Sequence, residues 1–254
     1  MNIGILGTGI IASALVRGFC TAGTSHHFFL SPRNAEKAAG LSAAFPENVT
    51  VCEDNQQVVD NSQLVWLCLI PRMAEEILAP LKFRPEQDVL SIMSDHTIEH
   101  VRTMVGEVGR VWRMVPLPFA AMHIGPIAYF PKDEDIDSVF QPLGKVISME
   151  KEGELSVISG LTGIMSAYYM LIHETVQFGV SQGLPQTAAL EYMTSFYEAL
   201  DIKARSHEGG DIYGLAYEMT PGGLNEMALK HILSEDGYKP WTDALQKVMD
   251  RLNK

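Results

Sequence analysis

Residues 3–12 read I-G-I-L-G-T-G-I-I-A, an apolar run that leads into two glycines, Gly7 and Gly9. The second part of this run fits G-x-G-x-x-A, the loop that joins a strand to a helix in dinucleotide-binding domains. Gly7 permits the tight turn, Gly9 lets the backbone approach a pyrophosphate, and Ala12 allows the helix to pack closely. Free N–H groups at the helix N-terminus favour the phosphates. The segment therefore predicts a β-α-β unit that binds a dinucleotide.

The residues that follow alternate short apolar runs with helical patterns up to about residue 150. This alternation predicts a parallel sheet with crossover helices, and the continuous apolar runs are typical of strands covered on both faces. The expected strands are Asn2–Leu6, His27–Leu30, Val49–Val51, Leu64–Ile70, Val89–Met93, Val111–Met114 and Ile127–Phe130. The helices between them are expected to begin near Ile10, Asn34, Ala74 and Thr97.

After Lys151 the strand patterns vanish, and the remainder is predicted to be helical. The expected helices are Glu154–Gln182, Pro185–Lys203, Gly210–Met219, Gly223–Ser234 and Pro240–Leu252. Pro185 and Pro240 suit first-turn positions, because a missing N–H costs nothing there. We therefore expect an α/β chain with a Rossmann-like doubly wound sheet over residues 1–151 and an all-α domain over residues 152–254.

The chain of 254 residues carries a formal net charge of −12. This charge argues against nucleic acids and anionic membranes as partners, because both need clustered Lys and Arg. Cys20, Cys52 and Cys68 are irregularly spaced, which favours reduced thiols in a cytoplasmic protein, and the strand-like start indicates no secretory signal. The apolar stretch Leu155–His173 has the length of a membrane span, but its Ser, Thr and Gly residues favour a helix buried between partners.

The end of the second expected strand indicates which dinucleotide is bound. An acidic residue there would hold the ribose 2′-hydroxyl of NAD, but the sequence reads Leu30-Ser31-Pro32-Arg33-Asn34. A hydroxyl, a guanidinium and an amide suit a 2′-phosphate, so we predict NADP(H); a solvated Arg33 beside a helix start is the alternative. The predicted cofactor-binding residues are Gly7, Thr8, Gly9, Ile10, Ile11, Ser31, Arg33, Asn34, Asn55, Leu69 and Pro71.

Several segments, in the same order, resemble the pyrroline-5-carboxylate reductase family. They are the glycine loop, the Ser-x-Arg-Asn segment, the strand ending in Pro71, Glu174 ahead of Gly179-Val180-Ser181-Gln182-Gly183-Leu184, and Thr220-Pro221-Gly222-Gly223, which is similar to the family's SPGG turn. The resemblance implies an NADPH domain followed by a helical domain that forms a homodimer, or a higher oligomer, through interleaved helices. It also implies hydride transfer to a cyclic C=N bond beside a carboxylate, the last step of proline synthesis.

The departures from the family fall in its substrate motifs. The MPNTP segment is Val115-Pro116-Leu117-Pro118-Phe119 here, SGSGPAY is Thr162-Gly163-Ile164-Met165-Ser166-Ala167-Tyr168, and VKP is Leu69-Ile70-Pro71. In the SPGGTT turn, Leu224 and Asn225 replace the hydroxyls that would help to hold a substrate carboxylate. This pattern fits a relative that reduces another imine or a carbonyl compound, or a non-catalytic NADP-binding sensor or scaffold dimer.

The resemblance implies catalytic roles for Glu174 and Asn225, and substrate contacts from Thr220, Gly222, Gly223 and Leu224. The glycine pair can offer backbone N–H groups to an anion, or it forms a simple helix-entry turn. Glu174 is expected on one helix face with Gly163, Ala167, Met170 and Gln177. It acts there either as a proton relay or as an interhelical hydrogen-bonding group.

Ser94, Asp95 and His96 follow the fifth expected strand. The acid and the imidazole suit proton supply to a substrate, but capping of the next helix by Ser94 or Asp95 is the favoured interpretation. No metal is expected, because His96 and His100 lack a third ligand. A β-hydroxyacid dehydrogenase would need a Lys in the long helix, and residues 154–182 contain none.

Overall fold

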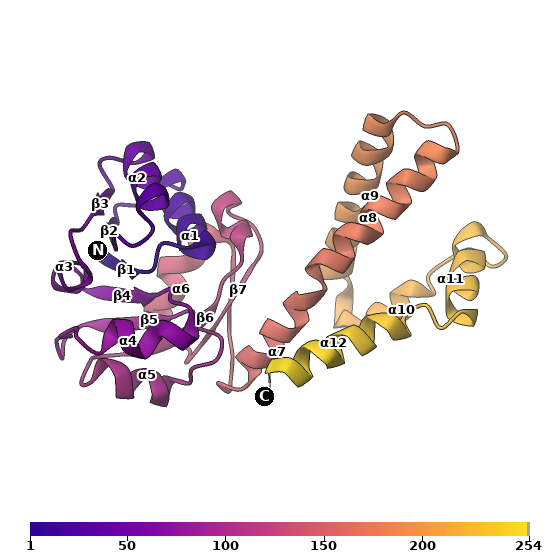
Figure 1. Cartoon of the computed structure of the whole chain (residues 1–254). Helices are drawn as coiled ribbons and strands as arrows, with labels where there is room; N and C mark the ends of the chain where they lie inside the picture. The colour runs from indigo at the N-terminus through magenta and orange to yellow at the C-terminus, as the bar shows by residue number, and fades with distance from the viewer. Residues whose placement is uncertain (253–254) are drawn as a thin grey trace. The chain divides into compact units, whose positions relative to one another are not determined.

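The computed structural model describes residues 1–252, and the chain divides into two compact units, Met1–Ser159 and the residues from Gly160 onward. The first unit contains a sheet with flanking helices, and the second is helical (Figure 1). Helix α7 (Glu154–Leu161) runs across this division. The domain boundary predicted at residues 151/152 stays a prediction.

An eight-stranded sheet in the order β3-β2-β1-β4-β5-β6-β7-β8 organises the first unit. The order turns back between β1 and β4, and this switch point is where doubly wound sheets bind ligands. The predicted Rossmann-like fold class is therefore confirmed. The strands are β1 (Asn2–Leu6), β2 (His27–Leu30), β3 (Val49–Val51), β4 (Leu64–Leu67), β5 (Asp88–Ser91), β6 (Val111–Val115), β7 (Pro126–Phe130) and β8 (Lys145–Ser148).

The sheet is not parallel throughout, because β7 runs antiparallel to β6 and parallel to β8. The expectation of a parallel sheet is wrong at β7 for a steric reason. Between Val115 and Pro126 the chain holds only the 3-10 turn η2 (Pro118–Met122), and this connection is too short for a crossover helix. Strand β8 was not predicted, since this edge strand is short and half-exposed.

The helices of the first unit cover both faces of the sheet (Figure 1). They are α1 (Ile10–Thr21), α2 (Ala35–Ala44), α3 (Asn55–Asp60), α4 (Ala74–Leu78) after the 3-10 turn η1 (Pro71–Met73), α5 (Ile98–Val105), and α6 (Glu134–Phe140) with η3 (Gln141–Leu143). Helices α3 and α6 were not predicted. Each is a short helix that an Asp side chain caps at its N-terminus, Asp54 for α3 and Asp133 for α6.

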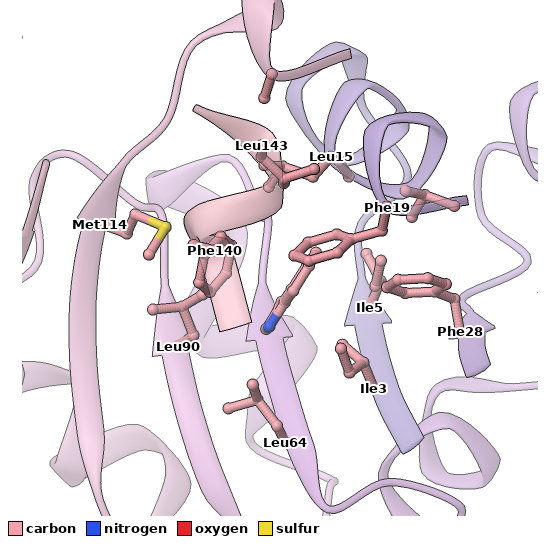
Figure 2. Close-up of a cluster of buried hydrophobic side chains, with 14 of the residues drawn as sticks. Ile3, Ile5, Leu15, Phe19, Phe28, Leu64, Leu90, Met114, Phe140 and Leu143 are labelled. Carbon is pink, nitrogen blue, oxygen red and sulfur yellow. The ribbon is translucent and has the colours of Figure 1, made fainter. Parts of the chain in front are cut away.

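One apolar cluster joins the sheet to α1 and α6, as Figure 2 shows. Ile3, Ile5, Phe28 and Leu64 come from neighbouring strands and belong to the same cluster as Phe19 of α1. These side chains are almost fully buried, and such burial is the main favourable term in folding. A second cluster fills the other face beneath α3, α4 and α5. The sheet is thus held rigidly by two apolar layers, and the loops at its carboxyl edge rest on that base.

The second unit is built from α8 (Met165–Ser181), α9 (Gln186–Ser206), α10 (Ile212–Ala216), α11 (Leu224–Ser234), α12 (Lys239–Leu252) and the 3-10 turn η5 (Glu208–Gly210). The single helix predicted over residues 154–182 is interrupted by the 3-10 turn η4 (Thr162–Ile164). Helix α12 packs tightly there, since a Cβ on Gly163 would lie 3.0 Å from Val248 Cγ2. Between α8 and α9, the rings of Tyr168 and Tyr197 lie 5.8 Å apart.

The stretch Glu154–Ser181 is long and apolar enough to cross a membrane by length and composition. It is the one helical stretch of this kind within residues 1–252, and 11% of its most apolar window is buried. A single such helix is weak evidence for a membrane span, because a helix that becomes buried against other protein passes the same test.

Candidate cofactor and substrate site

The glycine loop between β1 and α1 forms an open cradle at the switch point of the sheet. Gly7 has a φ of +98°, and a Cβ on it would lie 2.4 Å from the carbonyl oxygen of Cys68. Beside Gly9, in contrast, a Cβ would meet nothing within 4 Å. No side chain caps the N-terminus of α1, so its first N–H groups are available to an anion. The geometry fits the pyrophosphate of a dinucleotide.

Ser31 holds this loop in place from the end of β2. Its hydroxyl accepts a hydrogen bond from the Gly7 N–H at 3.1 Å, and its carbonyl accepts one from the Thr8 hydroxyl at 3.4 Å. Ser31 and Thr8 are both almost fully buried. We predicted that Ser31 would contact a 2′-phosphate, but its buried hydroxyl instead positions the loop. Thr8 likewise shapes the loop from within.

A cleft of about 350 Å³ extends from the loop along the carboxyl edge of the sheet. Arg33 and Asn34 lie on one side of it, and Leu69 on the other. The Arg33 guanidinium is exposed, and its Nη2 donates to Met73 Sδ at 3.4 Å, a weak contact that a phosphate would readily replace. The full lining consists of Gly7, Thr8, Gly9, Arg33, Asn34, Ala35, Cys68, Leu69 and Ile70. This lining contains no carboxylate, which suits a 2′-phosphate.

The other predicted cofactor residues lie around this cleft. Ile10 and Ile11 begin α1, and Ile10 is 67% exposed. Asn55 is the first residue of α3, and Pro71 is the first of η1; neither is among the lining residues. Burial raises the pKa of the Cys68 thiol, so this side chain is a neutral wall of the cleft at physiological pH.

A buried ion pair organises the carboxyl edge of β5 and β6. The Arg113 side chain in β6 is 7% exposed, and its Nη1 lies 2.9 Å from Glu152 Oε1. Arg113 also donates to the Ser94 carbonyl oxygen at 2.8 Å, while Glu152 accepts the Ile98 N–H at 2.7 Å. The pair therefore ties β6, the loop after β5, the start of α5 and the segment before α7 together.

The N-terminus of α5, after the β5 loop, is not capped by the residue that we predicted. Thr97, rather than Ser94 or Asp95, is the N-cap of α5, and its hydroxyl accepts the His100 N–H. Ser94 donates to Asp95 Oδ1 at 2.6 Å instead. The His96 ring lies against the His100 ring, with centroids 4.4 Å apart. Among residues 1–252 no group of three or more His, Cys, Asp or Glu side chains could hold a metal ion.

The two predicted catalytic residues belong to the second unit. Glu174 lies on α8 and is exposed, and its carboxylate has no hydrogen-bond or ion-pair partner among the described residues. Gly163 falls in η4, so it is not part of the α8 face on which we expected it beside Glu174. Asn225 is exposed in the first turn of α11. The catalytic roles of Glu174 and Asn225 stay predictions.

The turn before α11 already uses the N–H groups that we expected to be free. Gly222 has a φ of +73°, and its N–H donates to the carboxylate of Glu226. The Gly223 N–H donates to the Thr220 carbonyl oxygen at 2.9 Å. Leu224, which was predicted to contact substrate, is 79% exposed. The prediction of a free anion-binding glycine pair is therefore wrong for the chain by itself, because Glu226 supplies the anion.

Two charged residues of these sites, Arg113 and Glu226, were not predicted. Arg113 was hidden in the strand pattern Val-Trp-Arg-Met-Val, although a lone cation inside an apolar run is a signal for a buried partner. Glu226 is the third residue of α11, the position from which a Glu commonly bonds back to the residues before a helix. That spacing after the glycine pair was available in the sequence, whereas Glu152 lies far from Arg113 along the chain.

Comparisons with known proteins show relatives for the first unit and for the chain as a whole. Residues 2–95 match the family described as NADP oxidoreductase, coenzyme F420-dependent. This match confirms the predicted NADP(H)-binding oxidoreductase domain. The pyrroline-5-carboxylate reductase of Glycine max is 27% identical over 74% of this chain and 72% of its own length. Pyrroline-5-carboxylate reductase 2 of Bacillus subtilis is 25% identical over 90% of this chain and 86% of its own.

Solved structures share the fold over the whole chain. The pyrroline-5-carboxylate reductase of Streptococcus pyogenes is 22% identical, with a TM-score of 0.86 over 99% of this chain and 98% of its own. That of Plasmodium falciparum, solved with NADP bound, is 16% identical, with a TM-score of 0.82 over 99% and 97%. With the motifs above, the chain is similar to the pyrroline-5-carboxylate reductases over most of its length, and the chain is an NAD(P)H-dependent oxidoreductase.

Proposed function

We propose that the chain is an NADPH-dependent reductase that acts in the cytoplasm and reduces a cyclic imine to proline or a related ring compound. The observation that carries this proposal is the cleft at the switch point, where the glycine loop is open to a pyrophosphate and Arg33 replaces the acid of NAD-binding domains. NADPH supplies a hydride to the carbon of the C=N bond, whose nitrogen takes one proton.

The residues of the first unit bind and orient the cofactor in this proposal. The N-terminus of α1 holds the pyrophosphate, and Arg33 with Asn34 holds the 2′-phosphate. Leu69, Ile10 and Ile11 supply apolar walls, while Asn55 and Pro71 border the path of the cofactor. The Arg113–Glu152 pair fixes the loop after β5, so that Asp95 and His96 keep a defined position at this edge.

The second unit supplies the substrate-binding residues Thr220, Gly222, Gly223 and Leu224, with Glu174 and Asn225 as the catalytic pair. Glu174 is the one acidic residue of α8, and its exposed carboxyl group can take up a proton and pass it to the imine nitrogen. Asn225 is suited to orient the substrate by hydrogen bonds, because its amide carries both donors and acceptors.

We also propose that the functional form is a homodimer joined through the helical unit. Large apolar side chains are exposed along α8 and α9, among them Tyr169, Phe178, Tyr192 and Phe196. A concentration of exposed large apolar side chains on a helix pair is typical of a protein interface. Pairing of two copies would bury the stretch Glu154–Ser181 against protein and explain its apolar composition without a membrane.

Two measurements test the proposal. NADPH and NADH are first titrated by calorimetry, and NADPH is expected to bind more tightly. NADPH oxidation is then followed with pyrroline-5-carboxylate and with uncarboxylated cyclic imines, and at least one imine is expected to be reduced. Tight NADPH binding without turnover of any imine would favour a non-catalytic sensor or scaffold, whereas failure to bind NADPH would overturn the cofactor assignment.

A further inference from the structure

The N-terminal turn of α11 is closed by a charge of the chain itself. The Glu226 carboxylate accepts the Gly222 N–H through Oε2, and its Oε1 lies 2.6 Å from Lys230 Nζ. Both contacts lower the pKa of Glu226, with the Lys230 hydrogen bond as the larger cause, so the carboxylate is charged at neutral pH. The turn therefore presents a negative charge where a substrate carboxylate would need donors.

A bound carboxylate would face two difficulties at this turn. It would have to displace Glu226 from the Gly222 N–H, because the Gly223 N–H is already used by the Thr220 carbonyl oxygen. It would also lie beside the Glu226 carboxylate, whether or not Glu226 is displaced, and two like charges in close contact repel each other. The Lys230 cation offsets only part of this cost, since its side chain is 72% exposed and its ammonium group already pairs with Glu226.

The side chains that flank Glu226 favour a different ligand. Leu224 begins α11 and is 79% exposed, so the first turn carries an apolar surface where a hydroxyl would serve a carboxylate. A protonated imine is a cation, and an uncarboxylated one carries a net positive charge that the Glu226 carboxylate attracts. A carboxylated imine in the same protonation state is a zwitterion whose own carboxylate is repelled.

We propose that Glu226 determines specificity in this chain, selecting cyclic imines that lack a carboxylate beside the C=N bond. The inference rests on the proposed function, because it takes the turn before α11 as part of the substrate site. It departs from the substrate of the pyrroline-5-carboxylate reductases and identifies the residue that causes the difference.

The test compares two substrates that differ only in the carboxylate, 1-pyrroline and 1-pyrroline-5-carboxylate, with the full-length chain and NADPH. The wild-type chain is expected to show the higher kcat/KM for 1-pyrroline. Glu226→Gln keeps a hydrogen-bond acceptor for Gly222 but removes the charge. It is expected to shift the ratio of the two kcat/KM values about tenfold toward the carboxylated substrate, as expected when one like charge in contact is removed.

Two further variants separate specificity from stability. Asp243→Asn removes a matched Lys–Asp pair, Lys239–Asp243, at the same i,i+4 spacing on α12, and it should leave the ratio unchanged. Lys230→Met keeps Glu226 but removes its counter-charge, and it should shift the ratio further toward 1-pyrroline. A merely structural cap would lower both kcat/KM values together, so the ratio distinguishes the two roles.

A binding measurement keeps the inference independent of turnover. Proline and pyrrolidine, the reduced forms of the two substrates, are titrated into the chain saturated with NADP⁺. Glu226→Gln is expected to bind proline more tightly relative to pyrrolidine than the wild type does, even if neither imine is reduced and the proposed reduction fails. A wild-type preference for the carboxylated partner, or a ratio that Glu226→Gln leaves unchanged, would overturn the inference.

Discussion

The two units of this chain solve the problem of apolar burial in opposite ways. In the first unit, two layers of helices bury side chains such as Phe19 and Trp66 completely against the sheet. In the described part of the second unit, the buried apolar side chains are those of Val176 and Ala189, while Tyr192 is 70% exposed and Phe178 is 68% exposed. The first unit completes its own core, whereas the second leaves most of its large apolar side chains exposed.

The same contrast holds for the sites. The cofactor cleft is open, because Ser31 holds the glycine loop through the Gly7 N–H while no side chain caps the N-terminus of α1. The turn before α11 is closed by Glu226. The half that retains the family's glycine loop is preorganised for its ligand, and the half that departs from the family has satisfied its own polar groups.

The largest effect is expected from charging the exposed face of α9. Tyr192 and Phe196 stack on each other one turn apart, with centroids separated by 6.4 Å. The double variant Tyr192→Glu/Phe196→Glu would place two carboxylates in the proposed interface, at a cost of about 4 kcal/mol or more for their desolvation. The dimer dissociation constant should rise roughly a thousandfold. Light scattering over a range of concentrations measures it.

The control for this prediction comes from the first unit. Ile147 on the edge strand β8 is 40% exposed. Ile147→Glu should leave the dimer dissociation constant unchanged, because that unit has a complete core. If the α9 variant stayed dimeric at low concentration, the exposed apolar face would not be the interface, and the contrast between the units would need another explanation.

The next largest effect is expected at the buried guanidinium of the first unit. Arg113→Met leaves Glu152 and the Ser94 carbonyl oxygen without their donor, and breaking a buried pair in this way costs about 3 kcal/mol. Urea unfolding of the variant measures the loss. Glu152→Gln should cost less, about 1 kcal/mol, because the amide still accepts the Ile98 N–H and Glu152 is partly exposed. If the two variants lost equal stability, the guanidinium would be no more important to the buried pair than the carboxylate.

The glycine loop allows stability to be separated from binding by two matched variants. Gly7→Ala places a Cβ against the Cys68 carbonyl oxygen at a positive φ, and we expect it to lower the free energy of unfolding by about 3 kcal/mol. Gly9→Ala meets open space and should leave the unfolding midpoint unchanged, but weaken NADPH binding about a hundredfold by occupying the pyrophosphate position. Unchanged NADPH affinity in Gly9→Ala would contradict the assignment of the cradle.

The sequence predicted the first unit well because its signals are local. The strands at His27–Leu30 and Val49–Val51 and the start of α1 at Ile10 occur as expected, since each combines apolar periodicity with a turn residue. The elements that were missed, α3, α6 and β8, are short or half-exposed, so periodicity carries little information in them.

The candidate sites were harder to predict because their contacts join distant or already occupied groups. Ser31 was identified as a ligand contact from its type and position, but its hydroxyl was already needed by Gly7 in the preceding loop. The Arg113–Glu152 pair joins residues 39 positions apart, and nothing in either neighbourhood indicates the other. At Gly222, the glycines were recognised, but the competing carboxylate on the next turn was not.

The smallest effect is expected at Arg33, the residue that we expect to distinguish NADPH from NADH in the first unit. Arg33 is exposed beside the cleft, and among the described residues its guanidinium donates only to Met73 Sδ, so Arg33→Ala should not alter folding. It removes a bidentate partner for the 2′-phosphate, worth about 1.4 kcal/mol at an exposed site, and the Kd for NADPH should rise about tenfold. The Kd for NADH should stay unchanged, since NADH carries a hydroxyl at that position.

Lys247→Ala removes an exposed positive charge from α12 in the second unit and controls for net charge. If both variants weakened NADPH binding equally, long-range charge rather than Arg33 would select the cofactor, and the cofactor half would be no more preorganised than the substrate half.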